Sequence, residues 1–93
     1  MAINTVAAAY TVQATDEYLR VDATGGARTI TLPLSAAMIQ QDVIVAKVDN
    51  TGNAVTITAS GSEKINGSTT LVLSSQWAKT RLLSTGAGWE VIG

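Results

Sequence analysis

The sequence predicts a small all-β domain: an antiparallel β-sandwich or barrel of about eight short strands built from repeated hairpins. Thr, Val and Ile recur with a period of two, which is the period of strands that bury one face. Clusters of Gly, Asn, Asp and Ser separate these runs at short intervals. Short strands at regular spacing are typical of sandwiches and barrels.

The predicted elements follow from these runs in order. Pro33 ends the third strand, because its ring nitrogen cannot donate to a ladder. Residues 34–41 are the only helical candidate, and Ser35 is expected to cap a single turn there. The predicted strands are residues 10–14, 18–22, 28–32, 43–48, 54–59, 70–73, 77–83 and 89–92.

An internal repeat is the most informative local feature. Residues 20–31 align without gaps on residues 47–58, with the shared pattern basic-Val-Asp-x-Thr-Gly-x-Ala-x-Thr-Ile-Thr. Each copy predicts a strand, a tight turn and a second strand. Asp22 and Asp49 are expected to accept hydrogen bonds from amides two residues on, and the Gly to supply a positive φ. We interpret the repeat as a β-hairpin used at least twice.

The run Val43, Ile44, Val45 and Ala46 departs from alternation. A run that is apolar on both faces predicts a central strand covered on both sides. Either a neighbouring subunit provides the second cover, or the strand lies between the edges of two sheets, and periodicity does not separate these alternatives. On the first alternative, Val43, Ile44 and Val45 belong to a subunit interface.

Composition favours a homo-oligomer. The 93 residues make one domain, which we divide into an N-terminal arm (residues 1–9), ordered by a neighbour, and a single β-domain (residues 10–93). Charged residues are 14% of the chain, below the usual share of about 25%, and Cys and His are absent. So short a chain, without disulfides, is expected to bury neutral surface against copies of itself or a scaffold. A monomer with a bland surface is the alternative.

Catalytic and metal-binding patterns are absent from the sequence. No nucleophile and base are spaced to cooperate, and most acidic residues fall at predicted turns or strand ends. Residues 49–53 superficially resemble a calcium loop but lack its Asp-x-Asp spacing and closing Glu. Gly86-Ala87-Gly88 precedes a strand and is expected to be a hairpin turn. The sequence therefore predicts no enzyme, no metal and no cofactor.

Charge and hydropathy bear on other partners. The net charge of −1 offers no electrostatic attraction for nucleic acid or an anionic membrane. No apolar run approaches the roughly 20 residues that span a bilayer. We therefore expect neither nucleic acid nor membrane as a partner.

Trp77, Lys79 and Arg81 are expected on one face of one strand. An aromatic ring beside two cations can stack a base and bind phosphate, or dock on an acidic partner surface. The commoner explanation is an indole packed on its neighbours' alkyl stems. We group these three residues with Val43, Ile44 and Val45 as the predicted interface.

Five short motifs follow one another from residue 10 onward. They are Tyr10-Thr11-Val12-Gln13-Ala14-Thr15-Asp16, Val21-Asp22-Ala23-Thr24-Gly25-Gly26-Ala27, Thr29-Ile30-Thr31-Leu32-Pro33, Glu63-Lys64-Ile65-Asn66-Gly67 and Gly86-Ala87-Gly88-Trp89-Glu90-Val91-Ile92. Their order and spacing resemble a β-module that recurs in tailed-bacteriophage virion proteins.

The resemblance implies a structural role in tail fibres, baseplates or small capsid-decorating proteins, commonly as trimers. Fibre proteins carry the module after long shafts, whereas this chain begins at its own Met1. We therefore expect a capsid decoration (cement) protein, made in the host cytoplasm, that bridges subunits of the major capsid protein on the outer surface of the virion. The alternative is a tail-fibre or baseplate component that binds host carbohydrate through the turns at 24–26 and 50–53, or through Trp77 and Trp89.

Overall fold

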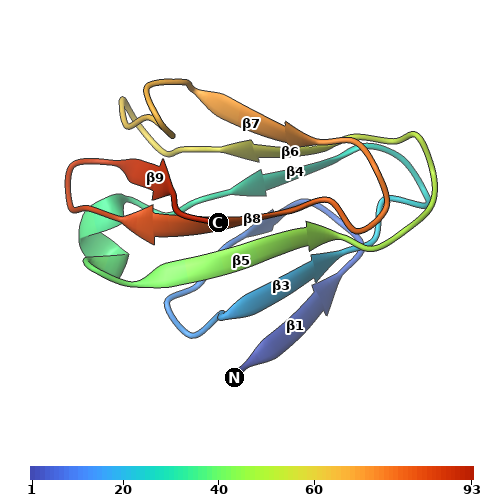
Figure 1. Cartoon of the computed structure of the whole chain (residues 1–93), viewed down its shortest axis with the longest axis horizontal. Coiled ribbons are helices and arrows are strands. Elements are labelled where there is room, and N and C mark those ends of the chain that lie inside the picture. Colours follow the sequence, from blue (N-terminus) through green and yellow to red (C-terminus); the bar gives the residue numbers. More distant parts are fainter.

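The computed structural model describes all 93 residues. They form two β-sheets that pack face to face, with one short 3₁₀ helix (Figure 1). The five-stranded sheet has the order β1 (Ile3–Val6), β3 (Tyr18–Val21), β5 (Asp42–Lys47), β8 (Lys79–Ser84), β9 (Trp89–Val91). The four-stranded sheet has the order β2 (Tyr10–Thr11), β4 (Arg28–Thr31), β6 (Val55–Thr58), β7 (Thr70–Leu73), and the helix η1 (Ser35–Met38) connects β4 to β5.

The chain alternates between the sheets through its first six strands. Strands β1, β3 and β5 pair in parallel in one sheet, and β2, β4 and β6 pair in parallel in the other. Each successive pair of strands is therefore one turn of a coil, and the three turns stack. The last strands reverse direction, because β7 pairs antiparallel with β6, β8 with β5, and β9 with β8.

The predicted antiparallel sandwich or barrel of hairpins is wrong. Both sheets mix parallel and antiparallel pairs, and neither closes into a barrel. In the repeat, residues 20–31 supply β3 to one sheet and β4 to the other, and residues 47–58 supply β5 and β6 in the same way. The repeated unit is thus an arch between sheets, and its copies stack with Ile30 beside Ile57. Alternation and turn residues fit an arch as well as a hairpin, so the pattern could not distinguish them.

The predicted turn chemistry is confirmed at both aspartates. The Thr24 amide donates to Asp22 Oδ1 at 2.9 Å, and the Thr51 amide donates to Asp49 Oδ2 at 3.1 Å. The expected positive φ at the glycine shared by the two copies is wrong: neither Gly25 nor Gly52 has one, and in the first copy the next residue, Gly26, has φ +148° instead. The second arch is one residue longer, and it turns without a glycine in the left-handed region.

The strand register shifts Lys47 by one residue relative to its position in the sequence repeat. In the four-stranded sheet the two copies pair at an offset of 27 residues (57 − 30), but Val21 pairs with Lys47 at an offset of 26 (47 − 21). A one-residue slip turns a side chain to the opposite face of its sheet. Lys47 is consequently fully buried, whereas Arg20, its counterpart in the first copy, is half-exposed.

The buried ammonium of Lys47 is neutralised by Asp49, with Nζ and Oδ2 2.6 Å apart. Asp49 also accepts a hydrogen bond from the Ala23 amide at 2.8 Å, and others from the amide and hydroxyl of Thr51. Burial alone would raise the pKa of the Asp49 carboxyl, but these donors outweigh it and hold the pKa far below its usual range. The Ala23 contact also ties the third turn of the coil to the second.

The core lies between the sheets and takes alternate residues from both. The apolar run in β5 correctly predicted a central strand, since β5 is third of the five. Val43 and Val45 point inward and are fully buried. The core residues are Val12, Leu19, Val21, Ala23, Ile30, Leu32, Met38, Val43, Val45, Val55, Ile57, Ile65, Leu73, Leu82 and Trp89.

The helical candidate at residues 34–41 is a single 3₁₀ turn, η1. Ser35 is its first residue and does not cap it as predicted. Its amide and hydroxyl instead donate to the two carboxylate oxygens of Glu63, at 2.8 and 2.6 Å. A side chain 28 positions later therefore holds the start of the helix.

The two ends of the chain differ in how well the pattern predicted their pairing. The predicted arm, residues 1–9, contains β1, which pairs with β3 through Ile3 beside Tyr18. Near the other end, β8 begins at Lys79 rather than at residue 77. The hairpin between β8 and β9 forms as predicted, with Gly86 at φ +89°.

Candidate functional site

The outer face of the five-stranded sheet, from β1 to β8, is the candidate site, and we call it the docking face. Parallel register places Ile3 beside Tyr18 and Tyr18 beside Ile44, and antiparallel register places Ile44 beside Arg81. Tyr18, Ile44 and Arg81 alternate with buried neighbours on their strands and point away from the core, and Ile3 is 64% exposed. They form a continuous row across four strands.

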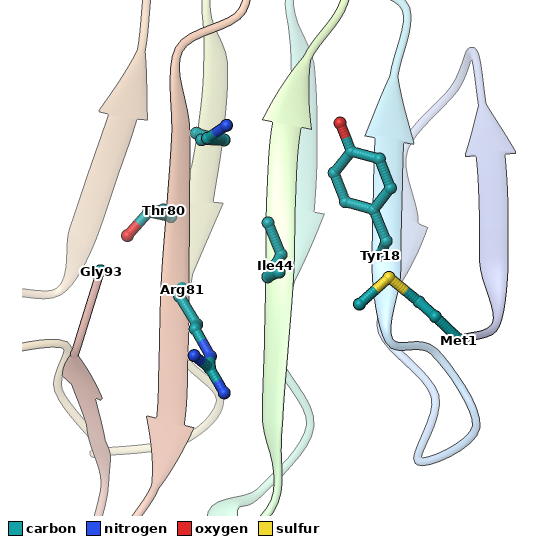
Figure 2. A pocket seen from close by; sticks show the side chains of 7 residues that line it. Met1, Tyr18, Ile44, Thr80, Arg81 and Gly93 are labelled. Atoms are coloured by element: carbon teal, nitrogen blue, oxygen red, sulfur yellow. The ribbon is translucent and has the colours of Figure 1, made fainter.

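A hollow of about 380 Å³ lies on this row. Figure 2 shows Met1 and Tyr18 on one side of Ile44 and Arg81 on the other. The hollow combines an aromatic ring, a thioether and an aliphatic side chain with cationic groups at its margin. Its lining residues are Met1, Tyr18, Ile44, Lys79, Thr80, Arg81 and Gly93.

Cationic side chains border the docking face. The register places Arg20 beside Ala46 and Ala46 beside Lys79, one row along from Ile44. Arg20 Nη1 donates to Thr5 Oγ1 at 3.1 Å, while Arg81 forms an ion pair with Asp42. The side chains of that ion pair are 53% and 37% exposed, so water screens it and it contributes little to folding. Its charges remain accessible to a partner.

Three of the six predicted interface residues meet on this face: Ile44, Lys79 and Arg81. Val43 and Val45 do not, because they point into the core. Tyr18 was not predicted to belong to the site. It reaches Ile44 only through parallel pairing of β3 with β5, which alternation within one strand does not reveal.

Trp77, the sixth predicted residue, lies apart from Lys79 and Arg81. It precedes β8 and sits in a β-turn in which the Ala78 amide donates to the Ser75 carbonyl at 3.0 Å. Its φ of +67° breaks the two-residue alternation that placed the three side chains on one face. The expectation that they share a strand face is therefore wrong.

The conformation of Trp77 is unusual for its residue type. Trp77 occupies the third position of the turn, where a positive φ ordinarily selects Gly or Asn. A left-handed φ costs an L-residue with a side chain about 1–2 kcal/mol. The side chain is nevertheless 60% exposed, so folding of the isolated chain buries only a minor part of the indole. By contrast Trp89, the other predicted aromatic platform, is buried at 2% exposure and belongs to the core.

Four connections meet at the end of the molecule that carries Trp77, and we call this region the arch end (Figure 1). They are residues 7–9, 22–27, 48–54 and 74–78. The Trp77 amide donates to the Lys47 carbonyl at 2.7 Å and Gln76 Nε2 to the Val48 carbonyl at 3.2 Å. These bonds hold the Trp77 turn beside the third arch. The only charged residues within the four connections are Asp22 and Asp49.

A partly buried polar cluster joins the first turn of the coil to the loop after β2. The Tyr10 hydroxyl donates to Asp16 Oδ2 at 2.7 Å, and Asn4 Nδ2 donates to the Tyr10 hydroxyl at 3.1 Å. Burial, followed by the bond to Asp16, raises the pKa of Tyr10. Asp16 also accepts from the Gln13 amide at 2.8 Å, so the cluster positions backbone.

Comparisons with known proteins do not assign the chain. No protein-family model matches it, and no curated protein matches it either. The structure holds no group of three or more His, Cys, Asp or Glu side chains that could bind a metal ion. None of its helices has the length and apolar character needed to cross a membrane.

Proposed function

We propose that this chain is a structural protein of a tailed-bacteriophage virion, a capsid decoration (cement) protein that binds the head shell. The observation that carries the proposal is the docking face, where an outward row through Tyr18 and Ile44 lines a hollow with cations at its margin. An apolar centre with a polar rim is the usual anatomy of a protein interface. The motif order described above supplies the virion context.

The docking face would contact the major capsid protein. Tyr18 and Ile44 supply the apolar centre, and Lys79 and Arg20 attract acidic groups around it. A protein that binds the assembled shell more tightly than free subunits stabilises the shell by mass action. No step in this role requires bond chemistry, and we propose no enzymatic activity.

We also propose that the protein acts as a homo-oligomer of three copies. The edge strands β1 and β7 carry neither a charged residue nor Pro, the residues by which edges usually avoid pairing. Val72 on β7 is 54% exposed. The unpaired backbone groups of such an edge can accept a strand of another copy. Light scattering of the purified chain gives the number of copies directly, and a single monomeric mass at every concentration would contradict this part of the proposal.

The first test of the virion role is the copy number of the protein per purified particle, measured by mass spectrometry against the major capsid protein. A simple lattice fraction of the capsid copy number is expected for a decoration protein. Complete absence from the particle would overturn the virion role.

A substitution then tests the docking face itself. Ile44→Glu places a carboxylate in the hollow and is expected to reduce occupancy of purified shells about tenfold or more. The matched control is Thr29→Glu, which places the same charge on the four-stranded sheet, where Thr29 is exposed. Equal occupancy by both variants would exclude the docking face as the capsid contact.

A tail-fibre or baseplate position is the second candidate, and the exposed Trp77 favours it. An aromatic platform at one end of a fibre component suits attachment to a host surface. A handful of copies per particle, in place of a lattice fraction, would select this candidate.

A further inference from the structure

From the arch end, we infer that Trp77 is the anchor of a binding site for an uncharged carbohydrate. The inference adds a ligand to the structural role proposed above, and it holds whether the head or the tail carries the chain. Two features of Trp77 point to a ligand: its left-handed φ of +67° and its 60% exposure.

The strain at Trp77 is not required by the turn. A Gly or Asn at the same position would form the same turn without strain or with less of it. Backbone strain of this kind concentrates at sites where a side chain must be presented to a ligand. The bonds from the Trp77 amide to the Lys47 carbonyl and from Gln76 to the Val48 carbonyl hold the turn in place. The indole is therefore presented to solvent on a fixed support.

The surroundings of Trp77 select the chemistry of the ligand. Its exposed neighbours in the turn are Ser74, Ser75 and Gln76, and Asn50 is exposed on the adjoining arch. Of the two charged residues of the arch end, Asp49 is paired with Lys47, whereas Asp22 accepts hydrogen bonds from Thr24 and has no cationic partner. The site therefore offers hydroxyl and amide groups around one aromatic ring, and its one unpaired charge is a carboxylate, which disfavours an anionic ligand.

A neutral sugar ring matches this arrangement. The C–H groups on one face of a pyranose carry a small positive charge and stack on the electron-rich face of an indole. Its hydroxyls exchange hydrogen bonds with amide and hydroxyl side chains at the rim. A protein partner fits less well, because interface cores are poor in Ser, and the turn residues that flank Trp77 are Ser, Gln and Ala.

The test combines binding with stability. Uncharged oligosaccharides built from glucose, galactose and N-acetylglucosamine are immobilised at high density, so that weak binding is detected. The purified chain is then applied to them at increasing concentration. Wild type is expected to bind at least one of them. Trp77→Ala and Trp77→Gly are expected to bind it about tenfold more weakly or not at all, the scale of one lost stacking contact.

The control for binding is Leu34→Ala. Leu34 is 55% exposed and lies just before η1, at the opposite end of the molecule from Trp77 (Figure 1). This variant loses a comparably exposed apolar side chain and is expected to bind the sugar as wild type does.

The control for strain is the pair Trp77→Gly and Trp77→Ala. Both lack the indole. Ala lowers the entropy of the unfolded chain relative to Gly, but at a positive φ the strain on Ala outweighs that gain. Trp77→Gly is therefore expected to unfold at a higher temperature than Trp77→Ala.

Four results would overturn the inference. In the first, wild type binds no uncharged oligosaccharide, and in the second, Trp77→Gly binds as well as wild type does. In the third, the Gly and Ala variants are equally stable, and in the fourth, the only change in Trp77→Gly is a smaller oligomer. The last would make Trp77 a contact between copies. None of the four alters the copy number per particle, so the structural role stands or fails separately.

Discussion

The buried pair of Lys47 and Asp49 allows an asymmetric prediction about stability. Asp49→Asn removes the counter-charge of the fully buried Lys47 ammonium, and its amide has one acceptor oxygen where the carboxylate has two, both of them in use. Removing the ammonium leaves the Asp49 carboxylate with three hydrogen-bond donors, the Ala23 amide and the amide and hydroxyl of Thr51. Asp49→Asn should therefore cost more than Lys47→Met.

The magnitudes follow from general values. Breaking a buried ion pair by removing one partner costs about 3–5 kcal/mol, and Asp49→Asn should fall in that range. Lys47→Met should cost about 1–2 kcal/mol, because donors still satisfy the remaining charge. A domain of this length has a free energy of unfolding of about 5–14 kcal/mol, so Asp49→Asn removes a substantial fraction of it.

Urea unfolding at pH 7 measures both costs, with tryptophan fluorescence as the signal. The free energies are comparable only if the denaturant slope is unchanged between variants. The double variant should cost less than the sum of the single ones, because the two side chains contact each other. If Asp49→Asn costs less than about 1 kcal/mol, or if Lys47→Met costs as much as Asp49→Asn, the account of this pair is wrong.

Three further predictions concern pH and packing. The folded pKa of Asp49 lies below its unfolded value, so its stabilisation is present above about pH 4 and is lost as pH falls further. The free energy of unfolding should therefore fall less steeply with decreasing pH in Asp49→Asn than in wild type. Parallel curves for the two proteins would contradict this. Thr80 is 4% exposed and its hydroxyl has no hydrogen-bond partner, so Thr80→Val should raise the free energy of unfolding by about 1 kcal/mol, and a loss would contradict the assignment. A Cβ on Gly88 would lie 3.0 Å from the Lys64 carbonyl oxygen, whereas one on Gly52 would meet nothing within 4 Å. Thermal unfolding should therefore show Gly88→Ala destabilised by about 1–3 kcal/mol and Gly52→Ala within about 0.5 kcal/mol of wild type, or slightly more stable.

Local features were predictable from the sequence because they depend on neighbouring residues. The Asp22 and Asp49 turns formed as predicted, since the carboxylate reaches amides only two residues away. The apolar run in β5 identified a central strand, because such a run is typical of strands that have neighbours on both sides. The hairpin before β9 followed from its glycines.

The docking face was only partly predictable. Ile44, Lys79 and Arg81 were named, but the same pattern also named Val43 and Val45, which are core. Period-two alternation says that neighbouring residues point to opposite faces, without saying which face is inside. Trp77 was placed on the wrong surface because its positive φ interrupts the alternation two residues before β8 begins. Tyr18 was missed because its neighbour Ile44 is 26 residues away in the chain (44 − 18).

The sequence by itself determined that this protein is built from short β-strands, that two copies of one strand–turn–strand unit follow each other, and where the turns of the repeat lie. These properties depend on residue type, alternation and contacts within a few positions. Only the tertiary structure decided that the units are arches stacked in parallel, that Lys47 faces the interior, and that Tyr18, Ile44 and Arg81 share one surface. These outcomes depend on which strands pair and in what register, and one residue of slip in a connection is enough to reverse the face that a side chain occupies.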